Sequence, residues 1–99
     1  MACYVKNVHN TSGPGSMIAQ WEEYTGRKCP PYCSNVDCVN ELDDENKCGA
    51  HVYKCCKNGS VINYGRYIVP LCKECNNANN NDIMEIESED LLVPLSELE

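Results

Sequence analysis

The residues with the clearest chemistry in this 99-residue chain are its nine cysteines. Cys72 and Cys75 are separated by two residues, so one tight turn can present both sulfurs to the same metal ion. Zinc favours four soft ligands at the corners of a tetrahedron, and a pair with this spacing supplies two of them. The pair therefore predicts half of a site for one structural Zn²⁺.

The other two ligands are expected from the cysteine-rich segment upstream. Cys33 and Cys38 form one candidate pair, and Cys29 and Cys33 form another. We predict that Cys33, Cys38, Cys72 and Cys75 bind the ion, with Cys29 as the alternate. Cys29 is kept because Pro30 and Pro31 beside it would stiffen a metal-binding turn. A second ion that uses Cys48, Cys55 or Cys56 stays open.

Disulfide bonds are the rival explanation for so many cysteines in a small domain. The first residues lack the basic start and apolar run of a signal peptide, which favours a reducing, cytoplasmic location and metal-bound thiols. An odd number of cysteines also prevents complete pairing within one chain. No stretch approaches the roughly 18 apolar residues of a membrane span, so no membrane association is expected.

The net charge of −7 arises from the end of the chain. Residues 1–81 contain eight acidic and eight basic residues, whereas residues 82–99 contain seven acidic residues and no basic one. We therefore divide the chain into a zinc-binding domain at 1–81, with its zinc core at 29–78, and an acidic C-terminal segment at 82–99 that includes a possible docked strand. This charge does not favour nucleic-acid binding, which relies on Lys and Arg. A protein partner is favoured.

One helix and several strands are expected to position the cysteines, which gives a small α+β domain. Ser16 can cap a helix over 16–25. Met17, Trp21 and Tyr24 share one face of it, and Gly26 suits its end. Trp21 is expected to anchor the core. Asn58-Gly59 predicts a two-residue β-hairpin turn. Strands are expected at 3–8, 50–57, 60–64, 66–69 and 83–87.

The segment Gly49-Ala50-His51-Val52, the hairpin after it and the segment Ile68–Asn76 together resemble the treble-clef zinc fold of the HNH endonuclease superfamily. The resemblance covers roughly residues 29–78. It implies a zinc knuckle first, then a His-containing strand and a hairpin, and finally a cysteine pair that opens a short helix. On this basis we expect a treble-clef-like domain.

The same resemblance assigns roles to two residues if the protein is a nuclease. His51 matches the histidine that activates water, and Asn76 matches the final residue near the catalytic metal. However, Ala50 replaces the metal-binding Asp of the family, and a nuclease needs a divalent metal at the phosphate. His51 therefore has three interpretations: a structural residue, a zinc ligand or a general base.

These observations favour a non-catalytic zinc-binding module that acts as a binding or scaffold domain. One alternative is a diverged HNH-like nuclease. Another is a nucleic-acid-binding zinc finger, whose basic surface would come from Lys54, Lys57, Arg66 and Lys73.

Overall fold

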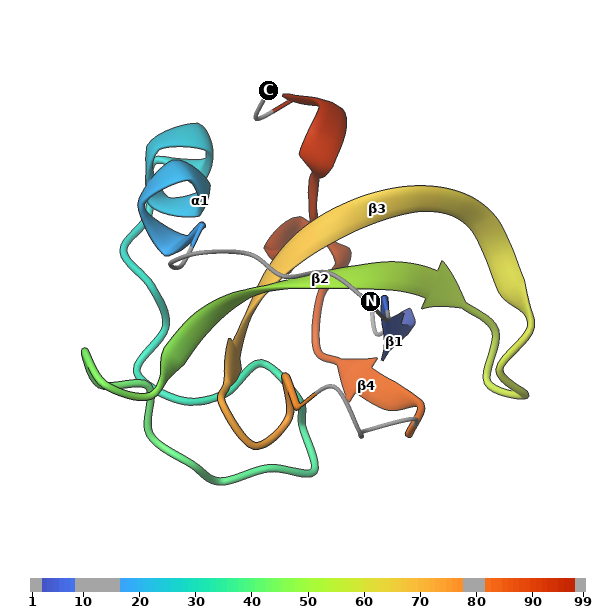
Figure 1. The fold of residues 1–99 in the computed structure, drawn as a ribbon, viewed down its shortest axis with the longest axis horizontal. Coiled ribbons are helices and arrows are strands. Elements are labelled where there is room, and N and C mark those ends of the chain that lie inside the picture. The colour runs from blue at the N-terminus through green and yellow to red at the C-terminus, as the bar shows by residue number, and fades with distance from the viewer. Residues whose placement is uncertain (1–2, 9–16, 78–81, 98–99) are drawn as a thin grey trace.

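A five-stranded antiparallel sheet organises the chain in the computed structural model, which describes residues 3–8, 17–77 and 82–97 (Figure 1). The strand order is β4-β1-β2-β3-β5. The strands are β1 (Cys3–Asn7), β2 (Lys47–Cys55), β3 (Val61–Cys72), β4 (Met84–Ile86) and β5 (Val93–Pro94). The helices are α1 (Ile18–Thr25) and two 3₁₀ turns, η1 (Glu89–Leu91) and η2 (Leu95–Glu97). The predicted α+β class is therefore confirmed.

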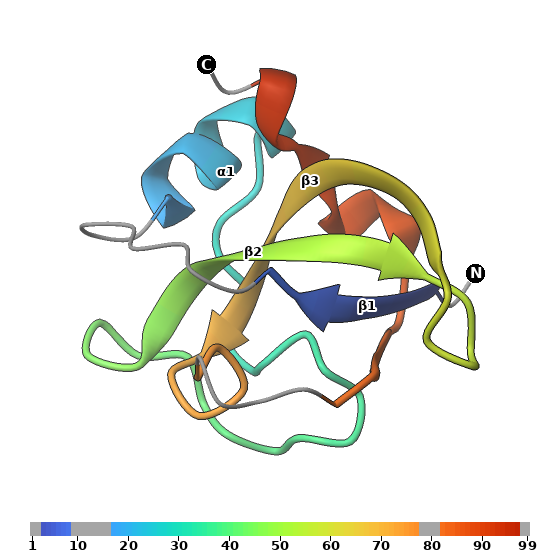
Figure 2. The ribbon, with the colours of Figure 1, turned by 45° about the vertical axis from the view of Figure 1, so that its right-hand side comes forward.

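Residues 34–36 connect the two sides of this sheet. The Ser34 N–H donates to the Pro70 carbonyl of β3 at 3.1 Å, and the Val36 N–H donates to the Glu85 carbonyl of β4 at 2.9 Å. Asn35 also forms a bridge with Ile86. Residues 34–36 thus fill the space between β3 and β4, and the curved sheet wraps around toward a partly closed barrel (Figure 2).

The main core lies on the inner face of the sheet and includes three of the cysteines. In β2, Ala50 and Val52 are fully buried because alternate side chains of a strand point to the same face. They pack in one cluster with Cys33, Cys72 and Cys75. The cysteine region is therefore continuous with the hydrophobic core.

A smaller core lies on the opposite face and consists of Trp21, Ile68 and Val93. Figure 1 shows α1 and η2 in the upper part of the view, away from the loops at the bottom. The Trp21 ring N–H donates to the Leu91 carbonyl at 2.9 Å, which links the helix to the C-terminal segment. Trp21 is 1% exposed, so its predicted role as a core anchor is confirmed.

Helix α1 differs in detail from the sequence prediction. It begins at Ile18 after Met17, which gives no side-chain cap, and Gly26 ends it in the left-handed conformation with φ of 70°. The predicted cap, Ser16, lies outside the described residues. Ile18 and Trp21 are the buried positions, whereas Tyr24 is 52% exposed. Tyr24 was therefore wrongly assigned to the buried face, because this short helix meets the sheet mainly through one turn.

The hairpin between β2 and β3 also differs from the prediction of a two-residue turn. The Gly59 N–H donates to the Cys56 carbonyl, and the Cys56 N–H donates to the Ser60 carbonyl, both at 2.8 Å. Gly59 has a φ of 90°, so it occupies the left-handed position after a turn centred on Lys57 and Asn58. The two predicted strands after it form one strand, β3. Pro70 does not interrupt β3, because its carbonyl accepts the hydrogen bond from the Ser34 N–H and this contact needs no N–H from Pro70.

Two strands come from the acidic C-terminal segment. The prediction of a strand over 83–87 agrees with β4, which pairs with β1 through Met84–Ile86. β5 adds Val93 and Pro94 next to Ile68 and Tyr67. The described part of 82–99 therefore contributes both to the sheet and to the packing around Trp21.

Gly49 is required where α1 approaches the sheet. A Cβ at this position would lie 2.9 Å from both the backbone N and C of Met17. We expect Gly49→Ala to lower the free energy of unfolding by about 1–3 kcal/mol, because the backbone before α1 must shift. Chemical denaturation measures this change.

Gly26→Asn is the matched control for Gly49→Ala. No atom lies within 4 Å of a Cβ at position 26, and Asn tolerates the left-handed conformation of Gly26. Gly26→Asn is expected to keep most of the stability. Equal losses in the two variants would contradict the steric explanation for Gly49.

Candidate metal centre

Four cysteine sulfurs converge at the end of β3. The Sγ atoms of Cys33, Cys38, Cys72 and Cys75 all lie within 4.8 Å of one another, and those of Cys38 and Cys72 are 3.8 Å apart. Four thiolates bound tetrahedrally at about 2.3 Å from zinc would be about 3.8 Å apart. The four residues therefore fit a tetrahedral metal ion. They are the group that the prediction named.

The first pair is held on a short two-stranded ribbon. Tyr32 and Glu41 form an antiparallel bridge, and the Cys33 N–H donates to the Asn40 carbonyl at 2.9 Å. The Cys38 N–H donates to the Asn35 carbonyl at 2.9 Å and closes the turn between the pair. This ribbon, residues 32–41, is called the knuckle below. Because its residues 34–36 are bonded to β3 and β4, the sheet fixes the position of the first pair.

The second pair lies where β3 ends. Residues 73–76 form a turn, in which the Asn76 N–H donates to the Cys72 carbonyl at 2.9 Å. The Asn7 side chain of β1 donates to the Cys75 carbonyl at 2.8 Å. The Lys73 N–H donates to the Asn46 carbonyl at 3.0 Å, which ties the turn to the residues before β2. Two distant segments, β1 and the residues before β2, thus hold this turn.

Four N–H groups point at the sulfurs. The backbone N–H groups of Cys72 and Cys75 donate to Cys33 Sγ and Cys72 Sγ, each at 3.4 Å. The Asn40 amide donates to Cys72 Sγ at 3.4 Å, and the Asn35 amide donates to Cys75 Sγ at 3.5 Å. Donors around sulfur stabilise the negative charge of a thiolate, which is the form that binds metal.

These surroundings separate the acidities of the thiols. Burial raises the pKa of Cys33 to about 11 and raises that of Cys75 as well. Burial also acts to raise the pKa of Cys72, but hydrogen bonds from Asn40, from the Cys75 N–H and from neighbouring thiols lower it to about 7. The Cys72 thiol is therefore substantially ionised at neutral pH, while the buried Cys33 and Cys75 thiols need a bound cation to lose their protons.

The remaining cysteines lie outside the four-sulfur group, and none of the described cysteines forms a disulfide bond. Cys29, the alternate ligand, packs at the edge of the main core, and its thiol donates to the Pro30 carbonyl at 3.6 Å. Cys48 donates to the Asn46 carbonyl, Cys55 is buried and Cys56 is exposed. In the part of the chain that the structure describes, no second cluster of three or more candidate ligands includes Cys48, Cys55 or Cys56.

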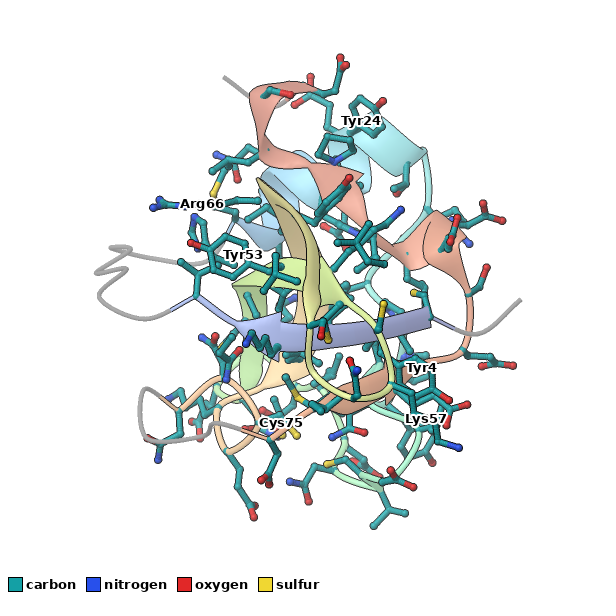
Figure 3. The ribbon with its side chains drawn as sticks, turned by 90° about the vertical axis from the view of Figure 1, so that its right-hand side faces the viewer. Tyr4, Tyr24, Tyr53, Lys57, Arg66 and Cys75 are labelled. Atoms are coloured by element: carbon teal, nitrogen blue, oxygen red, sulfur yellow. The ribbon has the colours of Figure 1, made fainter. Side chains whose placement is uncertain are left out.

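His51 lies on the other face of the sheet from the sulfurs. It is adjacent in β2 to Ala50 and Val52, which face the main core, and its strand partner is Ile68 of the smaller core. Figure 3 shows Tyr53 and Arg66, which share the outer face with His51, on the opposite side of the sheet from Cys75. His51 is not in the four-sulfur group. Asn76 is half-buried in the turn after Cys75.

The order of a knuckle, a long hairpin and a second cysteine pair follows the order that the HNH resemblance implies. The described residues after Cys75, Asn76 and Asn77, belong to the turn and its end, and residues 78–81 lie outside the described ranges. The treble-clef assignment stays a prediction.

The environment of His51 predicts a pH effect. Burial lowers the pKa of His51 from its ordinary value of 6.5, and the positive charge of Arg66 lowers it further. Since the unfolded chain then binds the proton more readily, His51 reduces stability as the pH falls below 6.5 and has no such effect above it.

An NMR titration should give a pKa below 6.5 for His51. Arg66→Met should raise this value, and Lys57→Met, which removes an exposed base of the hairpin turn, should not. A pKa at or above 6.5 would contradict this account.

No protein-family model, curated protein or solved structure matches the chain. In the described residues, no helix combines the length and the apolar character needed to cross a lipid bilayer.

Sequence reasoning missed the side chains that surround the sulfurs. Asn35, Asn40 and Asn7 each donate to a cysteine ligand or to its carbonyl group. Asn35 and Asn40 are each two residues from a cysteine of the first pair, so their proximity was visible in the sequence. Their direction depends on how the knuckle folds, which the spacing alone does not determine.

Proposed function

We propose that this chain is a small zinc-binding module with a structural ion, and that it acts as a non-catalytic binding domain for a protein partner. The convergence of four cysteine sulfurs within 4.8 Å is the observation that carries the proposal. Four thiolates in a tetrahedron favour zinc among the common divalent ions. Four protein ligands also leave no open position for water or substrate, which is the property of a structural site.

The position of the sulfurs supports a structural role. The ion would join the knuckle to the end of β3, and three of its four ligands belong to the main core. The apolar area that a 99-residue chain with seven aromatic residues can bury gives limited stability. A metal cross-link at this point would add to that stability. The centre is therefore placed where a small domain needs additional stabilisation.

The surroundings of His51 favour a non-catalytic domain over a nuclease. Ala50 is fully buried in the main core, where a metal-binding Asp would be needed. The positive charge of Arg66 acts on His51 and would repel a cation there. A catalytic metal beside His51 would therefore lack both a carboxylate and a favourable field.

The basic residues also argue against a nucleic-acid surface. Lys54 lies over the Tyr67 ring at 5.0 Å and approaches Glu89 at 3.9 Å, so its charge is partly engaged. Its strand neighbours place it on the inner face with Val5, whereas Arg66 is on the outer face with Tyr53. The four candidate bases thus do not form one surface.

The knuckle carries the features that suggest a protein partner. Tyr32, Val36 and Val39 are exposed large hydrophobic residues, and Val39 is 85% exposed. Residues 29–46 contain five acidic residues and no basic one. A centre with four thiolates and one Zn²⁺ adds two negative charges. We therefore propose that the knuckle contacts an apolar protein surface bordered by Lys and Arg.

Native mass spectrometry tests the metal proposal. The purified chain is expected to carry one Zn²⁺, and a strong chelator should remove it and expose four additional reactive thiols. An oxidised protein with disulfides, or a metal-free protein that keeps its fold, would contradict the proposal.

Site-specific photocrosslinking tests the partner. A photoreactive residue at position 39 should capture a basic protein in cells, and the yield should fall with added salt. The same residue at Ile62, which is 61% exposed on the hairpin, is the matched control. Equal capture from both positions would contradict a knuckle interface. Metal-dependent nicking of plasmid DNA that His51→Ala abolishes would instead establish the nuclease.

A further inference from the structure

We propose that Cys38 is the reactive thiolate of the metal centre and a modification site for soft carbon electrophiles. This inference rests on the proposed zinc site and concerns how that site reacts and releases its ion. It comes from differences among the four sulfurs in exposure and in hydrogen bonding.

Exposure is the first of these differences. Cys33, Cys72 and Cys75 are 7%, 0% and 8% exposed, whereas Cys38 is half-buried. The neighbours of Cys38 in the chain are Asp37 and the strongly exposed Val39, so solvent reaches the knuckle on this side. A reagent can therefore approach Cys38 without unfolding the main core.

Hydrogen bonding is the second difference. Cys72 Sγ accepts N–H bonds from Asn40 and Cys75, Cys33 Sγ accepts one from Cys72, and Cys75 Sγ accepts one from Asn35. Within the described residues no N–H group donates to Cys38 Sγ, whose neighbour is Cys72 Sγ at 3.8 Å. Each N–H donor withdraws electron density from a thiolate and lowers its nucleophilicity. Cys38 keeps the most available lone pair.

The chemical step is an alkylation at the metal-bound sulfur. A lone pair of Cys38 Sγ forms the new C–S bond while the bond from carbon to the leaving group breaks, and the leaving group departs with its electron pair. No proton is transferred because the thiolate is already ionised. The product is a neutral thioether, which binds zinc weakly, so the ion has three anionic ligands left and passes to a competing chelator.

Peptide mapping of the zinc-loaded full chain tests this order. The protein is treated with limiting iodoacetamide, metal release is followed with a chromogenic chelator, and each cysteine is quantified by mass spectrometry. Cys56 and other non-ligand thiols will react, but their peptides are resolved separately. Among the four ligands, Cys38 should react at least about tenfold faster than Cys72, since hydrogen bonds to charged groups have effects of this size. Zinc release should follow Cys38 modification.

First modification of Cys33, Cys72 or Cys75 would overturn the inference, as would reaction of all four only after the zinc has left. A protein that binds no metal before the reagent is added would instead contradict the proposed function. The initial metal content therefore distinguishes the two failures.

A ligand exchange provides a second test. Cys38→His keeps a zinc ligand but removes the nucleophilic sulfur, so iodoacetamide-driven zinc release should slow at least about tenfold. Cys33→His makes the same exchange at a buried ligand and should retain rapid release. If either variant fails to bind zinc, the mapping of the unmodified chain decides the question. Equal release from both zinc-loaded variants would contradict the assignment of Cys38.

Discussion

Cys72→Ser is expected to abolish metal binding and to leave the chain unfolded at room temperature. Cys72 is fully buried, and its sulfur or its N–H contacts each of the other three ligands. Structural zinc sites contribute about 10–16 kcal/mol of binding free energy, which is comparable to the whole stability of an ordinary domain, about 5–15 kcal/mol. Loss of this ligand therefore removes a contribution as large as the free energy of unfolding.

Circular dichroism and the fluorescence of the single tryptophan, Trp21, measure this loss, and native mass spectrometry measures the metal content. Cys56→Ser is the matched control because Cys56 is exposed and outside the four-sulfur group. It should keep both the zinc and the melting temperature. A folded, zinc-loaded Cys72→Ser protein would remove the basis for a structural metal centre.

Trp21→Ala is expected to lower the free energy of unfolding by about 3–5 kcal/mol. The ring is 1% exposed and packs with Ile68 and Val93, so its removal opens a cavity between α1 and the sheet. It also removes the ring N–H that donates to the Leu91 carbonyl, and it removes the cation–π contact with Arg27, which lies 5.7 Å from the ring centre. The substitution thus removes the largest side chain of the smaller core.

Urea denaturation followed by circular dichroism gives the stability of this variant, because the variant lacks the fluorescent ring. Tyr24→Ala changes an aromatic residue of the same helix that is 52% exposed, and it should alter stability by less than about 0.5 kcal/mol. Zinc content should stay at one ion in both variants. Equal destabilisation would show that the helix itself, and not the smaller core, determines the effect.

The sequence identified the four cysteines that converge because their chemistry is local. The spacing of Cys72 and Cys75 requires only one turn, and Cys33 and Cys38 lie on one ribbon that Tyr32 and Glu41 close. The strand at Met84–Ile86 was predictable for the same reason, since alternation is a property of a few adjacent residues. Features that depend on one turn or one strand were therefore recovered.

Features that depend on long-range packing were not predictable. Nothing in the spacing of Asn35, Asn40 and Asn7 indicates that their amides point at cysteine ligands. The exposure of Tyr24 depends on how much of α1 meets the sheet. The extent of β3 depends on the hydrogen bond from the Ser34 N–H to the Pro70 carbonyl. These outcomes are set by segments far apart in the chain, which a pattern within one segment does not contain.

The closure of the sheet by residues 34–36 has a consequence for the order in which this chain matures. All four cysteines have been synthesised once residue 75 has been added, but Val36 and Asn35 take their partners from Glu85 and Ile86. A nascent chain thus carries all four candidate ligands before the knuckle has both of its supports. Contacts across such long sequence separations form slowly. Stable retention of zinc would therefore require β4, and a ribosome-stalled chain ending before β4 should exchange its ion much faster than a chain that includes β4.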